Sequence, residues 1–123
     1  MKVIGTVKEM REAGRDLAET ATPIAFVPTM GALHRGHLTL ITKAKALSRI
    51  VVVSSFVNPK QFDNPEDLQR YPRDSARDQK LAEQAGADIF FEPTVEEMYP
   101  PGFLTSVNVS YVSNTLEGTS RPG

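Results

Sequence analysis

The chain contains no cysteine and only two histidines among its 123 residues. Without cysteine it can form no disulfide and can use no thiolate as a nucleophile or a metal ligand. No apolar stretch approaches the length of a membrane span, and the residues after Lys2 lack the long apolar core of a secretory leader. These absences suit a reducing compartment, and we expect a cytoplasmic protein with no membrane partner.

Charge of one sign is also lacking, since 14 basic residues face 15 acidic ones and the formal net charge is -1. This balance gives no electrostatic basis for binding nucleic acid or an anionic membrane surface. The length and a hydrophobic share of 40% predict one compact domain with a core of its own. The chain has no internal repeat and no low-complexity segment.

Apolar periodicity alternates between helix and strand along the chain. It predicts, in order, a helix capped by Thr6 and ending near residues 20–22, a strand over 24–28, a helix from Gly36 to about Ser48, a buried strand over 50–57, a helix capped by Asp74 or Ser75 and stopped by Gly86, and a strand over 89–91. Such alternation is typical of an α/β fold with a Rossmann-like parallel sheet flanked by helices. Ligands of these folds bind at the carboxyl ends of the strands.

Both histidines lie in the turn between the first predicted strand and the helix after it. A helix N-terminus attracts anions, and Gly31 and Gly36 would allow the backbone to approach a ligand closely. His34 and His37 could both donate hydrogen bonds, so the turn predicts a phosphate site. Surface histidines in an ordinary turn are the alternative, and zinc is disfavoured because two histidines do not complete its ligand set.

A second polar loop follows the next predicted strand. Asn58 and Gln61 carry amides that could orient a polar substrate, and Phe62 could supply an apolar wall. Asn-Pro is also a common turn former, so ordinary turn chemistry is the alternative. If the two strands are neighbours, both loops face one pocket.

Four strings occur in the order and at the spacing of one family: residues 28–37 (PTMGALHRGH), 56–62 (FVNPKQF), 70–73 (RYPR) and 116–123 (LEGTSRPG). The chain resembles the pantothenate synthetases, the pantoate–β-alanine ligases of the HxGH nucleotidyltransferase superfamily. The resemblance implies ATP-dependent condensation of pantoate with β-alanine through a pantoyl adenylate, which yields pantothenate, AMP and pyrophosphate. It also implies Mg²⁺ with the ATP and a homodimer.

Roles follow from the resemblance residue by residue. His34 and His37 would be catalytic and hold the triphosphate, with His37 donating a proton to the departing pyrophosphate. Gln61, Asn58 and Met30 would bind pantoate or β-alanine. Asp78 would help to hold Mg²⁺, or would be a solvent-facing helix charge. The ATP-binding turn would comprise Met30, Gly31, Ala32, Leu33, His34, Arg35, Gly36 and His37.

Several expectations concern the rest of the chain. Tyr71 and Arg73 could shape the edge of the pocket, residues 107–112 could form an edge strand, and Glu117 could pair with Arg121. Because the family pattern continues beyond residue 123, we expect residues 1–123 to be a truncated N-terminal nucleotide-binding domain that is weak or inactive alone. Another HxGH nucleotidyltransferase and a non-catalytic nucleotide-binding module are the alternatives.

Overall fold

The structure is a computed structural model that describes residues 1–102. The predictions for residues 107–112, Glu117 and Arg121 lie outside the described residues. The elements run in the order β1 (Lys2–Ile4), α1 (Val7–Thr20), β2 (Ile24–Thr29), α2 (Arg35–Leu47), β3 (Ile50–Ser55), the 3₁₀ turn η1 (Pro59–Gln61), α3 (Pro65–Arg70), α4 (Ser75–Ala85), β4 (Ile89–Phe91) and α5 (Val95–Met98).

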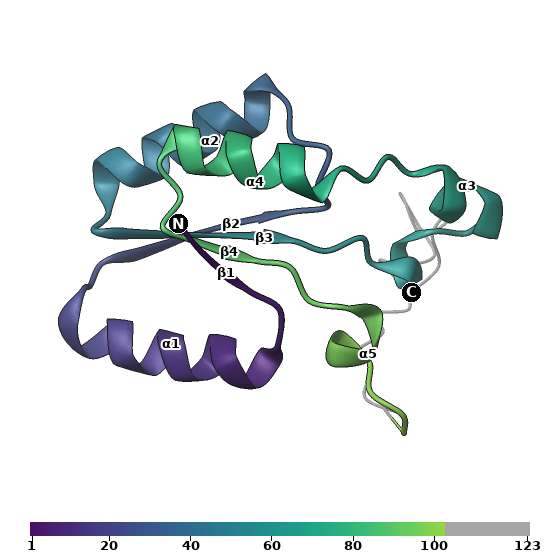
Figure 1. The fold of residues 1–123 in the computed structure, drawn as a ribbon, viewed down its shortest axis with the longest axis horizontal. Helices are drawn as coiled ribbons and strands as arrows, with labels where there is room; N and C mark the ends of the chain where they lie inside the picture. The colour runs from purple at the N-terminus through teal and green to yellow at the C-terminus, as the bar shows by residue number, and fades with distance from the viewer. Residues whose placement is uncertain (103–123) are drawn as a thin grey trace, which may run out of the picture.

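The four strands form one parallel sheet in the order β1-β4-β3-β2. Helix α1 covers one face of the sheet, while α2 and α4 lie side by side on the other (Figure 1). The predicted α/β class with a Rossmann-like parallel sheet is therefore confirmed. None of the helices in residues 1–102 has the length and apolar character needed to cross a membrane.

Alternation along the strands divides the core between the two faces of the sheet. Val51 and Val53 of β3 pack toward α2 and α4 with Ile41 and Phe90, whereas Val52 packs toward α1 with Ile4. Because β3 is central and covered on both faces, five of its six residues are buried. That double burial explains its continuous β-branched sequence.

Local capping explains where the longer helices begin and end. The Thr6 hydroxyl accepts the Glu9 N–H at the start of α1, and the Asp74 carboxylate accepts the Arg77 N–H at the start of α4. Helix α4 ends at Gly86, whose φ of 114° is left-handed. These predicted caps are confirmed. The sequence interpretation missed β1, α3 and α5, which have six residues or fewer and too little periodicity to detect.

Pairing between β2 and β3 sets the position of the two polar loops. Thr29 pairs with Ser55 at the carboxyl ends of these neighbouring strands. The histidine turn (residues 30–37), which follows β2, and the amide loop (residues 56–62), which follows β3, therefore leave the sheet at the same level. The expectation that they face one crevice depends on this register.

Candidate active site at the carboxyl ends of β2 and β3

The two imidazoles cap the helix that carries them. His34 is the N-cap of α2, and its Nδ1 accepts the Gly36 N–H at 3.0 Å. The Nδ1 of His37 accepts the His34 N–H at 3.2 Å, which completes a reciprocal capping box. The ring centroids are 4.0 Å apart. Ser, Thr, Asp or Asn is usual at the N-cap and Glu or Gln at the third helical residue, so histidines in both places are unusual.

This capping fixes where each imidazole carries its proton. A ring nitrogen that accepts an N–H cannot also bear a hydrogen, so neutral His34 and His37 hold the proton on Nε2. Burial, and secondarily the neighbouring His34, lowers the pKa of His37 below 6.5, while the Asp78 carboxylate opposes this shift. The lowered pKa favours the neutral form of His37, in which Nε2–H is the hydrogen-bond donor.

A buried carboxylate occupies the backbone donors of the turn before the cap. Gly31 and Ala32 both have positive φ, 77° and 51°, and the N–H groups that follow this left-handed turn converge on one anion, so we call the turn a nest. The Ala32 and Leu33 N–H groups donate to the two oxygens of Asp78, each at 2.9 Å. Asp78 is 2% exposed. The anion in this nest is thus a side chain of the protein itself.

Five backbone N–H groups of the turn already have acceptors within the protein. Side chains of the protein accept the backbone N–H groups of Gly31, Ala32, Leu33, His34 and Gly36. These five N–H groups are therefore engaged within the protein, and the role of the turn in ATP binding stays a prediction. The two histidines also offer an anion their Nε2–H groups, because their Nδ1 atoms accept backbone N–H groups.

The glycines of the turn make room for protein side chains. A Cβ on Gly31 would lie 2.9 Å from Ser55 Oγ and 3.1 Å from the Asp78 carboxylate. A Cβ on Gly36 would lie 2.8 Å from Cε1 of His34. Both glycines are therefore needed to seat the nest and the cap.

Asp78 was expected to hold Mg²⁺ or to be a solvent-facing helix charge, and the structure shows a different environment. It is buried, so the solvent-facing alternative is wrong. Its two oxygens are engaged by backbone donors, and Arg77 lies 3.7 Å away while donating to the Leu33 carbonyl. No group of three His, Cys, Asp or Glu side chains in residues 1–102 could hold a metal ion. Asp78 thus does not fit as a magnesium ligand.

A sequence signal for this role existed but was overlooked. Asp78 shares the inward face of α4 with Leu81, Ala82 and Ala85, at spacings of three, four and seven residues. A charged residue on an apolar face must find a partner inside. The spacing could have identified Asp78 as buried, although not which groups it binds.

The histidine turn and the amide loop line one cavity of about 680 Å³, as predicted. Of the predicted site residues, Met30, Ala32, His34, His37, Asn58 and Gln61 line it. The others do not: Leu33 belongs to the core, Arg35 and Gly36 are exposed outside the lining, and Gly31 faces a smaller neighbouring cavity. Residues that the interpretation missed complete the wall, among them Phe26, Ser54, Phe56, Phe91 and Met98.

The two amides of the loop differ in how they are constrained. The Asn58 Oδ1 accepts the Lys60 N–H at 3.0 Å and caps η1, whereas the Gln61 side chain is exposed. Phe62 does not line the cavity as expected. Its ring instead packs against Tyr71, with the ring centroids 5.7 Å apart, and Tyr71 lines the cavity.

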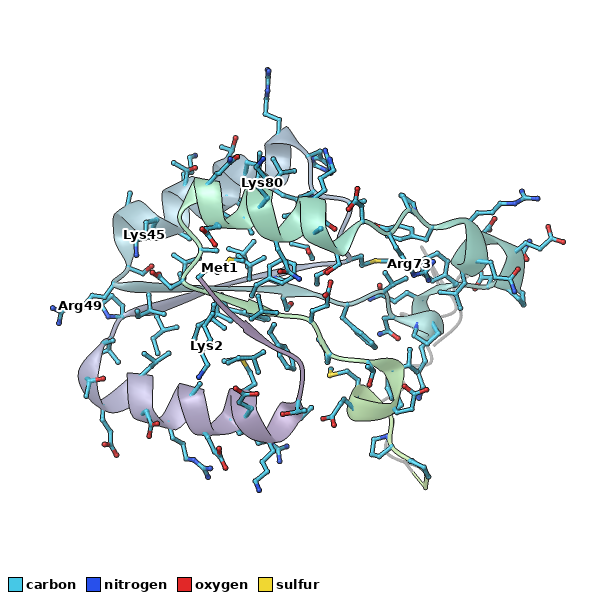
Figure 2. The ribbon with its side chains drawn as sticks, in the orientation of Figure 1. Met1, Lys2, Lys45, Arg49, Arg73 and Lys80 are labelled. Atoms are coloured by element: carbon cyan, nitrogen blue, oxygen red, sulfur yellow. The ribbon has the colours of Figure 1, made fainter. Side chains whose placement is uncertain are left out.

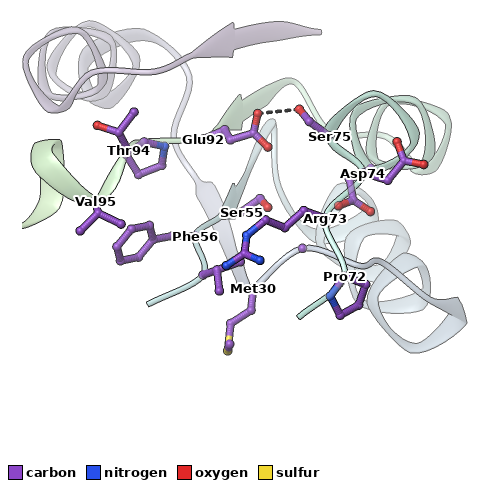
Figure 3. A pocket seen from close by; sticks show the side chains of 14 residues that line it. Met30, Ser55, Phe56, Pro72, Arg73, Asp74, Ser75, Glu92, Thr94 and Val95 are labelled. Carbon is purple, nitrogen blue, oxygen red and sulfur yellow. Dashed lines mark hydrogen bonds between the residues drawn. The ribbon is translucent and has the colours of Figure 1, made fainter. Parts of the chain in front are cut away.

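The smaller cavity, of about 300 Å³, lies beside the larger one and shares Met30, Phe56 and Pro93 with it. Figure 3 shows Ser75 hydrogen-bonded to Glu92 and Arg73 among the residues that line this cavity. Arg73 thus edges this smaller cavity. Among the labelled cations of Figure 2, Arg73 lies at the carboxyl ends of the strands, whereas Lys45 and Arg49 lie at the opposite end.

The model of one family, pantoate-beta-alanine ligase, matches residues 2–123. This chain belongs to that family. It is 51% identical over 123 residues to the pantothenate synthetase of Thermotoga neapolitana, covering all of this chain and 44% of the relative. It is 52% identical to that of Agrobacterium fabrum, covering 42% of the relative.

Solved structures of the family have the same fold. A pantothenate synthetase from Thermus thermophilus matches all of this chain and 43% of its own, with a TM-score of 0.87 at 49% identity. A pantoate-beta-alanine ligase from Francisella tularensis, complexed with beta-gamma ATP and beta-alanine, matches with a TM-score of 0.89 at 41% identity. This match covers all of this chain and 47% of the Francisella tularensis chain. The chain spans less than half the length of these relatives.

Proposed function

We propose that this chain is the N-terminal nucleotide-binding part of an enzyme that condenses pantoate with β-alanine at the expense of ATP. The observation that carries the proposal is the shared cavity, in which two fixed imidazole donors face an amide-bearing loop. The beta-gamma ATP and beta-alanine in the Francisella tularensis relative support the choice of ligands. Family membership favours this reaction over those of other HxGH nucleotidyltransferases.

The first step needs stabilisation of negative charge. A pantoate carboxylate oxygen attacks the α-phosphorus of ATP, and the bond from that phosphorus to pyrophosphate breaks. We assign the Nε2–H groups of His34 and His37 to the triphosphate oxygens, where charge grows as pyrophosphate leaves. A neutral His37 acts by hydrogen bonding, which refines its expected role as a proton donor. Mg²⁺ enters as part of the ATP substrate, with no ligand from Asp78.

The second step transfers the acyl group to the amine. The β-alanine nitrogen attacks the acyl carbon of the pantoyl adenylate, the bond to AMP breaks, and the amine loses a proton to solvent. We assign Gln61, Asn58 and Met30 to the binding of pantoate and of the incoming β-alanine. Because the acyl adenylate is hydrolysable, the cavity must exclude water while it exists.

The same proposal extends to the domain organisation and the assembly of the full-length enzyme. Residues 1–123 would form an N-terminal domain that is incomplete as a catalyst, because the remaining contacts to ATP and pantoate would come from the rest of the family's length. We further propose that the full-length enzyme is a cytoplasmic homodimer.

Exchange of labelled pyrophosphate into ATP tests the proposal most simply. The full-length enzyme should catalyse exchange only when pantoate is present, and pantothenate should form only when β-alanine is added. Residues 1–123 alone should show little or no exchange. Nucleotide binding without exchange by the full-length enzyme would contradict the proposal and favour a non-catalytic binding module.

A further inference from the structure

Tyr99 connects three points of the chain around the amide loop. It is the C-cap of α5, and its hydroxyl donates to Asn58 Oδ1 at 3.1 Å across 41 residues of sequence. Its ring contacts Phe56 at a centroid distance of 6.3 Å, and the Lys60 ammonium lies 4.5 Å from the ring centroid. All three partners belong to the segment that follows β3.

These contacts determine which end of the Asn58 amide is available to a ligand. Its carbonyl oxygen accepts two hydrogen bonds, one from the Lys60 N–H and one from the Tyr99 hydroxyl. A carbonyl oxygen has two lone pairs, so both are engaged. Rotating the amide by 180° would point its NH₂ group at the Lys60 N–H, which can only donate, and would remove the acceptor that the Tyr99 hydroxyl now has. The orientation is therefore fixed, and the NH₂ end remains for the cavity that Asn58 lines.

We propose that Tyr99 is a positioning residue that fixes Asn58 as a hydrogen-bond donor to an oxygen of the hydroxy-acid substrate. This inference rests on the proposed function and adds to it a residue outside the turn and the amide loop. A fixed NH₂ donor favours a carboxylate or hydroxyl oxygen and disfavours an ammonium group.

The Tyr99→Phe variant of the full-length enzyme tests this role. It keeps the ring against Phe56 and Lys60 and removes only the hydroxyl. Loss of one neutral hydrogen bond should raise the KM for pantoate by roughly 3- to 10-fold in pyrophosphate exchange, with the KM for ATP unchanged. Thr42→Val is the control, because it removes a hydroxyl from the exposed surface of α2 and should change neither constant.

The Asn58→Asp variant is a second test of the same role. An aspartate keeps both acceptor contacts, to Lys60 and Tyr99, but replaces the donor with a carboxylate oxygen. The enzyme should fold, and its KM for pantoate should rise more than in Tyr99→Phe, because a carboxylate repels the acid. Side-chain ¹⁵N NMR of Asn58 in Tyr99→Phe should show faster exchange of the NH₂ protons with water.

The outcomes separate this inference from the proposed function. Pantoate-dependent exchange by the parent enzyme, with an unchanged pantoate KM in Tyr99→Phe, would overturn the role of Tyr99 alone. An equal rise in the KM values for pantoate and ATP would show a merely structural contact and would also overturn it. No exchange by the parent enzyme would instead overturn the proposed function.

Discussion

The histidine turn and the amide loop line one cavity but differ in how many of their polar groups are fixed. In the turn, the two oxygens of Asp78 accept two backbone N–H groups, and both imidazoles accept backbone N–H groups as well. In the loop, Asn58 is fixed by Lys60 and Tyr99, while Gln61 is exposed. Groups that stabilise a charged transition state gain from a fixed position, whereas an exposed side chain such as Gln61 can adjust to the substrate that it binds.

Substitution of Asp78 should have the largest effect, because it removes the anion from the nest. In Asp78→Asn, one of the two backbone N–H groups faces an NH₂ group instead of a carboxylate oxygen. We expect a loss of about 2 to 4 kcal/mol in the free energy of unfolding, measured by urea denaturation of this chain. Asp16→Asn makes the same change on the exposed surface of α1 and should have almost no effect. Equal stabilities for the two variants would contradict a buried acceptor.

Replacement of the histidines should separate capping from anion binding. His34→Asn keeps a good N-cap but loses the Nε2–H donor, so its stability should match the parent while exchange in the full-length enzyme falls roughly 100-fold. His37→Ala should lose both the activity and about 0.5 to 1 kcal/mol of stability, because its Nδ1 caps the His34 N–H. Thermal denaturation and exchange rates measure the two effects. Full exchange activity in His34→Asn would exclude its imidazole from the reaction.

Gln61→Ala should leave the fold intact, because the side chain is exposed. Stability should change by less than about 0.5 kcal/mol. The KM for pantoate in the full-length enzyme should rise roughly tenfold, while the KM for ATP is kept. Unchanged pantoate kinetics would remove Gln61 from the site.

The smallest expected effect is a dependence of stability on pH. The pKa of His37 lies below 6.5 in the folded chain, so the unfolded chain binds more protons between these two values. Stability should therefore fall as the pH drops from 6.5 through the folded pKa, and this contribution should be constant above 6.5. Denaturation across this range, compared with His37→Gln, isolates the contribution. A parent and variant with parallel pH profiles would exclude it.

The sequence predicted those features that local patterns determine. The buried strand that begins at Ile50, the caps at Thr6 and Asp74 and the stop at Gly86 all follow from residues close together in the chain, although the strand ends at Ser55 and not at residue 57 as predicted. The shared cavity was also predictable, because parallel neighbouring strands place their carboxyl ends together.

The predictions failed where a distant side chain replaces an expected partner. Nothing near Ala32 and Leu33 shows that a carboxylate from α4 accepts their N–H groups. Likewise, nothing near Asn58 shows that Tyr99 donates to its amide. Both contacts depend on tertiary packing, which sets the polarity of the site but leaves no local pattern.

The central claim is that both histidines cap α2 through Nδ1 and present Nε2–H to the cavity. Long-range ¹H–¹⁵N NMR of the imidazoles tests it directly, because the chain has only two histidines. At a pH of about 7.5, above the usual histidine pKa, the spectrum should show both rings protonated on Nε2, with Nδ1 unprotonated. Protonation on Nδ1 in either ring would contradict the capping box and the donor role that rests on it.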